Sequence, residues 1–311
     1  MVYIILLNWN NATDTISCLK SISNITDVEY KVIICDNLSA DNSYNDILEF
    51  LTCDENYKHS FSEYTKNNLN GGCDFSGKKA ALIQNGANLG FAGGNNVGIK
   101  FALLQSNMDY VWLLNNDTEV QPSSLSEMIA RFEDDEKIGV CGSRLVYYHQ
   151  RDKIQGLGGI INPVTCATRH YPWLESSDKE FNDNAVELKI DYVLGASMLF
   201  SRLALEKTGL LCEDYFLYYE EVDICNRLKQ AGFSIGVASK SIVYHKEGAS
   251  TGHGKSDIAD FCSVKNRLLI AKKFYPKYIL TVKFSLFGVI FNRLRRREYS
   301  RAIKYLKFFI I

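Results

Sequence analysis

The chain has 311 residues, of which 46% are hydrophobic and 23% charged, and its formal net charge is −1. These values exclude an intrinsically disordered chain and fit one large α/β domain with an appendage, or two small domains. None of the nine cysteines forms a C-x-x-C pair, so we expect buried free thiols in a reducing cytoplasm, with no zinc ribbon or redox pair.

The first half of the chain alternates short apolar runs with helical patterns. Residues 2–7 predict a buried strand, because the run is too short for a signal-peptide core and has neither a basic flank nor a cleavage site. A helix is expected from about Thr13, and further strands at 32–35 and 110–114. Strands separated by helices predict βαβ units and a mainly parallel sheet.

The middle of the chain predicts a less regular set of elements. Residues 53–79 are rich in Asn, Gly and charge, which favours a surface insertion with little core. Pro122 suits the first turn of the next helix, whose inward side chains would be Leu125, Met128, Ile129 and Phe132. Residues 156–172 favour a hairpin or an acceptor-side loop.

Four elements are then predicted before the chain changes character. Residues 193–200 predict a strand that crosses Gly195 and Ala196, and 222–231 predict a helix that ends at Gly232. Residues 234–238 and 242–244 predict two further strands.

The C-terminal part is strongly basic. Residues 265–311 hold thirteen Lys and Arg and one acid, a net of +12, which leaves −13 for residues 1–264. A helix is expected up to Pro276, followed by an apolar run at 278–291 that is too short to span a membrane. We therefore divide the chain into a domain at 1–256 and a helical basic tail at 257–311. The tail would lie on an anionic membrane surface, or pack on the domain with a solvated basic side.

Polar residues follow three of the predicted strands. Ligands of open parallel sheets bind at the carboxyl ends of strands, so we expect chemistry at Asn8, Asp36 and Asp117. Asp36 would accept from a base or a ribose hydroxyl, or cap a turn. Asp117 would hold a hard cation that neutralises a diphosphate, or simply end its strand in a turn.

A glycine- and asparagine-rich segment runs from Asn88 to Gly98. Its glycines would let the backbone approach a ligand, its amides would donate and accept, and the following helix would present its N-terminus to a phosphate. A plain glycine-rich turn is the alternative. The G-x-G-x-x-G fingerprint is missing after the first strand, which argues against a nicotinamide dehydrogenase.

Acids and an imidazole complete the set of candidates. Asp223 and Arg227 are four residues apart and are expected to pair, which leaves Glu220 and Glu221 to take a proton from a sugar hydroxyl. The alternative is that these acids only stabilise the start of a helix. His245 follows another strand and would ligate a metal or serve structure.

Taken together, these segments resemble the family-2 glycosyltransferases, especially bacterial rhamnosyltransferase-like members. The resemblance runs from Val2 to about Thr251. It rests on seven segments in this order: 8–10, 36–37, 88–96, 114–118, 195–196, 216–223 and 243–251. It implies a GT-A fold, an α/β architecture with a mainly parallel sheet, whose nucleotide-binding half covers about 1–120 and whose acceptor-binding half covers about 121–256.

The resemblance also implies a role for each matching residue. Glu221 would be the catalytic base, in a position where the family usually has Asp. Asp117 and His245 would hold Mg²⁺ or Mn²⁺, and Gly195, Ala196 and Glu220 would bind the acceptor. The nucleotide-sugar would lie against Asn8, Trp9, Asn10, Asp36, Asn88, Gly93, Gly94, Asn95 and Asn116.

The implied reaction is a single inverting displacement on a nucleotide-sugar donor. dTDP-rhamnose is favoured, with UDP-hexose and UDP-N-acetylhexosamine as alternatives. The acceptor would be a glycan or lipid-linked glycan of cell-surface polysaccharide synthesis at the inner face of the cell membrane, and no nucleic-acid partner is expected. A nucleotidyltransferase is disfavoured because residues 8–20 contain no glycine, and the remaining rival is an inactive binding protein of the same fold.

Overall fold

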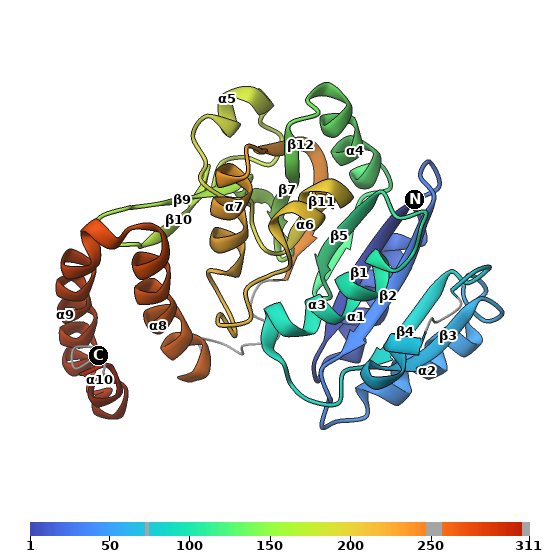
Figure 1. Ribbon diagram of the computed structural model, residues 1–311, viewed down its shortest axis with the longest axis horizontal. Helices are drawn as coiled ribbons and strands as arrows, with labels where there is room; N and C mark the ends of the chain where they lie inside the picture. The colour runs from blue at the N-terminus through green and yellow to red at the C-terminus, as the bar shows by residue number, and fades with distance from the viewer. Residues whose placement is uncertain (72–74, 247–256, 307–311) are drawn as a thin grey trace.

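The computed structural model describes residues 1–71, 75–246 and 257–306 (Figure 1). Its strands are β1 Val2–Asn8, β2 Tyr30–Asp36, β3 Phe61–Thr65, β4 Ala80–Gln84, β5 Tyr110–Asn115, β6 Thr118–Val120, β7 Ile138–Tyr147, β8 Gln150–Gly156, β9 Gly158–Ile161, β10 Thr168–Tyr171, β11 Ser197–Ser201 and β12 Ser234–His245. Its helices are α1 Ala12–Ile22, α2 Ser43–Cys53, η1 Lys66–Gly71, α3 Gly90–Leu103, α4 Ser124–Asp134, α5 Asp183–Glu187, α6 Arg202–Thr208, α7 Glu220–Gln230, α8 Asp257–Phe274, η2 Pro276–Tyr278, α9 Ile279–Arg295 and α10 Tyr299–Leu306.

One ten-stranded sheet organises the chain, in the order β3-β4-β2-β1-β5-β11-β7-β12-β6, with β8 paired to β7. From β3 to β5 the pairing is parallel, as expected from strands that alternate with helices. β11 then runs antiparallel to both of its neighbours, so the second half of the sheet is mixed. The predicted mainly parallel α/β architecture is confirmed.

The parallel half is buried on both faces, which explains its continuous apolar runs. β1 and β2 are almost entirely buried, and α3 lies directly on them. A Cβ on Gly94 would lie 2.4 Å from Leu7 Cδ1, and one on Gly98 would lie 2.8 Å from Ile5 Cγ2. Glycine is therefore needed at both positions for α3 to approach the sheet.

Three predicted elements are wrong in extent. Residues 53–79 do contribute to the core, since they contain β3, which extends the sheet beside β4, and they bury Tyr57 and Phe75. The strand predicted at 193–200 begins only at Ser197, after a turn at Gly195 and Ala196. The two strands predicted at 234–244 form the single strand β12, because a register shift between Ala238 and Ile242 absorbs the polar residues that divide them.

Other elements agree with their sequence patterns. β9 and β10 form the hairpin predicted at 156–172. α4 begins just after Pro122 and buries Leu125, Met128 and Phe132, while Ile129 is only partly buried. α7 ends before Gly232, whose φ is +88°. All eight cysteines in the described ranges are unpaired, and six of them are buried.

The described part of the tail, 257–306, is helical as predicted. α8 ends at Phe274 before Pro276, and α9 and α10 follow. In Figure 1 these helices stand at one side of the molecule, with α8 between α9 and the sheet. Within the described ranges, every helix is too short or too polar to cross a lipid bilayer.

Candidate active site

A buried polar network lies at the carboxyl ends of β1 and β2. Asn8 and Asp36 are paired in register and neither is exposed to solvent. Asp36 Oδ1 accepts from Asn8 Nδ2 at 2.8 Å and from Ser39 Oγ at 2.6 Å. Its Oδ2 accepts from Ser39 N and from Gln84 Nε2, both at 3.0 Å. Four hydrogen bonds fill the acceptor sites of a carboxylate, so Asp36 would bind a nucleotide only by releasing one of these partners.

The same network continues across the sheet to Asn116. Thr15 Oγ1 donates to Asn8 Oδ1 at 2.8 Å and accepts from Asn116 Nδ2 at 2.9 Å. The structure thus brings Asn8, Asp36 and Asn116 into one chain of hydrogen bonds that runs across three strands. Thr15 was missed by the sequence analysis. The only available signal was a polar residue on the inward face of α1.

Asp117 and His245 face each other where β6 pairs with β12. Asp117 Oδ1 lies 3.3 Å from His245 Nε2, and no donor in the described residues makes a hydrogen bond to that oxygen. His245 Nδ1 is 2.8 Å from Gln155 Oε1, and a neutral imidazole that donates to this oxygen leaves the Nε2 lone pair facing the carboxylate. Two electron-rich atoms at this distance require a proton or a cation near them.

The surroundings of Asp117 keep its carboxylate ionised, which is the form that can bind a cation. Burial by itself would raise the pKa of Asp117, but its interactions with His245 and Lys246 outweigh burial and hold the pKa below its usual value. Lys246 also reaches Asp14 Oδ1 at 2.5 Å, and its backbone N–H donates to Asp117 O at 3.0 Å. Among the described residues, no group of three or more His, Cys, Asp or Glu side chains could hold a metal ion.

Glu220 and Glu221 are the first two residues of α7 and directly follow a strained turn. Tyr218 and Tyr219 have φ of 70° and 75°, the left-handed region that side chains other than glycine rarely adopt. One carboxylate oxygen of each glutamate is buried without a hydrogen-bond partner in the described part of the chain. Burial raises the pKa of both glutamates, and their mutual repulsion adds to the effect on Glu220.

The predicted pair on α7 is confirmed. Arg227 Nε donates to Asp223 Oδ1 at 2.6 Å, and Lys273 of α8 reaches Asp223 Oδ2 at 2.5 Å. Both oxygens of this buried carboxylate are thereby neutralised. The two preceding glutamates are not, and in the described ranges no hydrogen bond or ion pair joins either of them to Asp117 or His245.

Gly195 and Ala196 lie beside the end of β5. Asn115 N donates to Ala196 O at 3.0 Å, so the turn that precedes β11 sits next to the segment that carries Asn116 and Asp117. A Cβ on Gly195 would meet nothing within 4 Å. The backbone at Gly195 therefore borders open space, and its predicted role in acceptor binding stays a prediction.

The glycine-rich segment joins the parallel part of the sheet to the loop before α7. Gly90 has φ of +69°, and a Cβ there would lie 2.4 Å from Phe216 O, which accepts from Phe91 N at 2.8 Å. Asn96 Nδ2 donates to Leu211 O and to Glu213 Oε1, both at 2.9 Å. The start of α3 thus holds the loop that leads to Glu220.

The remaining predicted donor-binding residues differ in their surroundings. Asn95 is buried and donates to Phe91 O at 3.0 Å, and Gly93 and Gly94 are closely packed. Three other predicted residues, Trp9, Asn10 and Asn88, are exposed. Trp9 has 40% of its surface accessible, Asn10 Oδ1 accepts from Ala40 N, and Asn88 Oδ1 accepts from Gly90 N. The resemblance also uses the segment 243–251, and residues 247–251 of that segment lie outside the described residues.

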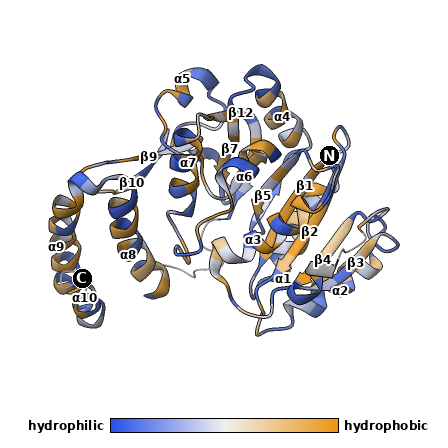
Figure 2. Ribbon diagram, viewed as in Figure 1, coloured by the Kyte–Doolittle hydropathy of each residue, from blue (hydrophilic) through white to orange (hydrophobic). Residues whose placement is uncertain are grey.

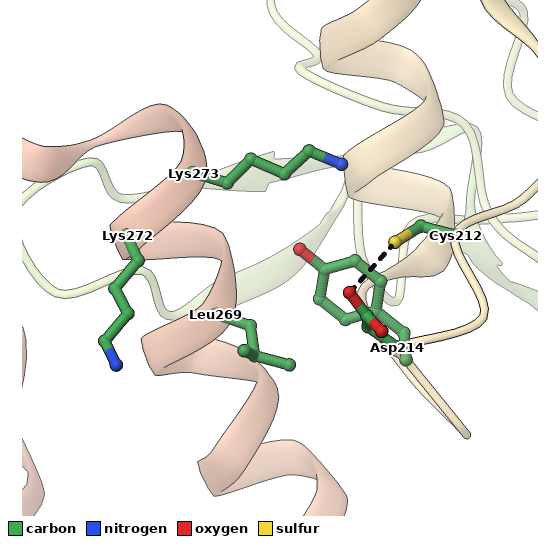
Figure 3. Close-up of a pocket in the computed structure, with 6 residues that line it drawn as sticks. Cys212, Asp214, Leu269, Lys272 and Lys273 are labelled. Atoms are coloured by element: carbon green, nitrogen blue, oxygen red, sulfur yellow. Dashed lines mark hydrogen bonds between the residues drawn. The ribbon is translucent and has the colours of Figure 1, made fainter. Parts of the chain in front are cut away.

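A cavity of about 260 Å³ lies between α8 and the loop before α7 (Figure 3). Its lining residues are Cys212, Asp214, Tyr215, Leu269, Lys272 and Lys273. In Figure 3 the Lys273 side chain extends from α8 toward α7, and Cys212 contacts Asp214. None of these residues is among the predicted site residues.

Comparison with solved structures identifies the class of protein. The structure superposes on S. aureus TarS 1-349 with a TM-score of 0.54 and 13% identity, over 94% of this chain and 73% of that one. It superposes on GalNAc-T7 with UDP, GalNAc and Mn²⁺ with a TM-score of 0.61 and 12% identity, over 90% of this chain and 49% of that one. The chain has the GT-A fold of glycosyltransferases.

Comparison of sequences then identifies the family. Residues 3–209 match the model of glycosyl transferase family 2, and the chain belongs to that family. It is 24% identical to the low-salt glycan biosynthesis hexosyltransferase Agl10 of Haloferax volcanii, over 72% of this chain and 71% of the relative. It is 27% identical to the N-acetylglucosaminyl-diphospho-decaprenol L-rhamnosyltransferase of Mycobacterium tuberculosis, over 53% of this chain and 58% of that protein.

Proposed function

We propose that this glycosyltransferase is an inverting enzyme that transfers a sugar, with L-rhamnose from dTDP-rhamnose favoured, to a glycan or lipid-linked glycan acceptor. The observation that carries the proposal is the buried carboxylate oxygen of Glu221, which has no hydrogen-bond partner within the described residues. A carboxylate held in this state has a raised affinity for a proton, which is what deprotonation of a sugar hydroxyl requires.

The proposed reaction begins with proton transfer to Glu221. Glu221 takes the proton of the acceptor hydroxyl, whose oxygen attacks the anomeric carbon of the donor as the bond to the nucleoside diphosphate breaks. Inversion follows because attack and departure occur on opposite faces of that carbon. Glu220, Gly195 and Ala196 would bind the acceptor beside Glu221.

The residues at Asp117 fit the divalent cation that the fold implies. Asp117 Oδ1 and His245 Nε2 face each other at 3.3 Å, and Gln155 Oε1 lies 2.8 Å from Nδ1. Mg²⁺ or Mn²⁺ bound there would neutralise the negative charge of the leaving diphosphate. Asp117 and His245 would be the protein ligands, and diphosphate oxygens and water would supply the others, as is usual for such ions at phosphate sites.

The donor would bind over the ends of the parallel strands, in the half formed by residues 1–120. Asn8, Asp36 and Asn116, which are joined by hydrogen bonds through Thr15, would form the floor of the donor site, and the exposed Trp9 would contact the base. The names of two relatives support the choice of donor class, because one is a hexosyltransferase and the other an L-rhamnosyltransferase. UDP-hexose and UDP-N-acetylhexosamine are the alternatives.

The acceptor and location follow from the same comparison and from the charge of the tail. The mycobacterial relative is named for an acceptor built on a diphospho-polyprenol, which is held in a membrane. Thirteen basic residues against one acid in 265–311 favour contact with an anionic membrane surface. We therefore propose a role in cell-envelope polysaccharide synthesis at the inner face of the cell membrane.

A donor panel tests the proposal. Wild-type protein is heated with dTDP-rhamnose, UDP-glucose and UDP-N-acetylglucosamine, each with Mn²⁺, with Mg²⁺ and with a chelator. The favoured donor should raise the unfolding temperature only when the metal is present, and should release nucleoside diphosphate when a polyprenyl-diphosphate glycan is added. Failure of every donor to stabilise the wild-type protein more than Asp117→Ala would refute the assignment.

A further inference from the structure

The exposed faces of α9 and α10 each carry a row of large apolar side chains. They recur with helical spacing, so they lie along one side of each helix. Phe284 and Phe291 have 67% and 65% of their surface exposed. The full row consists of Leu280, Phe284, Phe287, Phe291 and Leu294 on α9, and Tyr299, Ile303 and Leu306 on α10. We call these eight residues the apolar row.

This row is not needed to hold the helices to the protein. α9 uses a different face for that purpose, with Val282, Leu286 and Ile290 buried. Arg293 Nη2 reaches Asp260 Oδ1 of α8 at 2.5 Å, which fixes α9 and α8 together. In Figure 2 the orange, apolar colouring of α9 continues onto the side turned away from α8. Large exposed apolar patches of this kind mark interaction surfaces.

The charge around the apolar row identifies the partner. The three acids of 257–306 are Asp257, Asp260 and Glu298, and all three form ion pairs with Arg293 or Arg301. The other basic residues of these helices therefore give the surface a large positive excess, carried by Lys277, Lys283, Arg295, Arg296, Arg297 and Lys304. Helical spacing places Lys283 and Arg295 on the two sides of the apolar row.

We propose that α9 and α10 lie in the interface of an anionic lipid bilayer, with the apolar row among the acyl chains and the flanking basic residues at the headgroups. This inference rests on the proposed action at a membrane face and specifies its mode. Aromatic and aliphatic side chains beside cations are the signature of an interfacial helix, whereas a purely electrostatic contact would need only the charges.

Vesicle sedimentation tests the inference with two kinds of variant. The double change Phe284→Ser and Phe291→Ser should weaken binding to phosphatidylcholine–phosphatidylglycerol vesicles by at least about tenfold per ring at any salt concentration, because each ring loses its burial. Replacement of Arg295, Arg296 and Arg297 by Gln should weaken binding only to the anionic vesicles, and less at high salt. Leu188→Ser is the matched control, since Leu188 is 90% exposed on α5's flank.

Two results would overturn the inference. One is wild-type vesicle binding by the double Phe variant. The other is a change from dimer to monomer in light scattering, with vesicle binding unchanged, which would assign the apolar row to a second copy of the chain. Donor hydrolysis measured without vesicles distinguishes the membrane proposal from the proposed function. The Phe variant should hydrolyse the donor as wild type does, so a loss of vesicle binding alone concerns only the membrane contact, and a lack of hydrolysis in wild type concerns only the proposed function.

A second observation concerns α8 and is independent of lipid. Tyr218 and Tyr219 occupy strained left-handed conformations directly before Glu220, and such conformations persist only when neighbouring groups hold them. Asn266 of α8 is 1% exposed, and its Nδ2 donates to Leu217 O at 2.9 Å and to Tyr218 O at 2.8 Å. A residue of the tail therefore fixes the turn that presents both glutamates.

We infer that Asn266 is a positioning residue for Glu221. It touches the backbone of the turn and not the carboxylate, so its loss should misplace the base without altering the donor site on the far strands. A misplacement of about 1 Å costs on the order of a hundredfold in rate.

The test separates kcat from the KM for the donor. Asn266→Ala should lower kcat by about ten- to a hundredfold with the KM for the donor within about twofold of wild type. Lys265→Ala is the control from the same helix, because Lys265 Nζ donates to Asp214 O outside the strained turn. If Asn266→Ala does not fold, the same measurements are made on Asn266→Ser, which keeps one hydrogen-bond donor at this position. An unchanged kcat, or a KM for the donor that rises as kcat falls, would overturn the inference.

Discussion

Replacing Glu221 by glutamine should both slow transfer and stabilise the protein at high pH. Glu221 is half-buried in the first turn of α7, and one of its carboxylate oxygens is buried with no hydrogen-bond partner in the described ranges. Glutamine has nearly the same shape but cannot take a proton from the acceptor. We expect kcat to fall by about 10²–10⁴-fold, the usual contribution of a positioned base.

The stability change can be worked out from the pKa of Glu221. Burial raises that pKa from 4.5 to about 7. Each pKa unit is worth about 1.4 kcal/mol, which corresponds to about 3 kcal/mol. Because the raised pKa lies in the folded state, the folded protein binds the proton more tightly than the unfolded chain. Wild-type stability therefore falls as the pH rises from about 4.5 to about 7.

Urea unfolding of both proteins near pH 5 and near pH 8.5 measures this effect. Glu221→Gln should be about 1–3 kcal/mol more stable than wild type at the higher pH, and the difference should be much smaller at the lower pH, where Glu221 is protonated. The gain is below the full value because burial also removes water from the glutamine amide. Glu127→Gln is the control, since Glu127 is the acid in the first turn of α4. If both variants lose about 0.3–1 kcal/mol and turn over normally, Glu221 serves only the helix dipole and the assignment is wrong.

Three further predictions concern the rest of the site. Asp117→Ala should lower metal-dependent release of nucleoside diphosphate by at least about a hundredfold, and a Mn²⁺ titration that matches wild type would contradict this. Asn8→Ala should cost about 2–4 kcal/mol in urea unfolding, because it removes one buried hydrogen bond from Asp36 and one from Thr15. Gly94→Ala should cost about 1–3 kcal/mol, since its Cβ would lie 2.4 Å from Leu7 Cδ1. Gly288→Ala, in α9 with nothing within 4 Å, should instead gain up to about 1 kcal/mol, and equal changes at the two sites would refute the packing argument.

The parallel half of the fold was predictable because its apolar runs have few alternatives. Residues 2–7 and 32–35 are too short for helices and too apolar for loops, and both are strands. β3 was missed because an edge strand need not be apolar, and the strand at Phe61–Thr65 has no fully buried residue. Tyr57 and Phe75 enter the core from loops, where periodicity carries no information.

The polar residues of the site were predictable as candidates, whereas their partners were not. Strand ends singled out Asn8, Asp36 and Asp117, since parallel strands direct their carboxyl ends to one edge. Nothing in the sequence pairs Asn116 with Thr15, about a hundred residues away, or assigns Asn266 to the turn at Tyr218. Such contacts depend on tertiary packing between elements that are distant in the chain.

The contact between the start of α3 and the loop before α7 bears on how the enzyme can move. Phe91 N donates to Phe216 O, and at Gly90 the backbones lie too close for a side chain to fit. This contact joins α3 and the parallel strands beneath it to the segment before α7, and we expect both parts to unfold in one cooperative transition. A hinge motion that separated α3 from the loop before α7 would break the hydrogen bond between Phe91 N and Phe216 O. We therefore expect substrates to enter through rearrangement of surface loops.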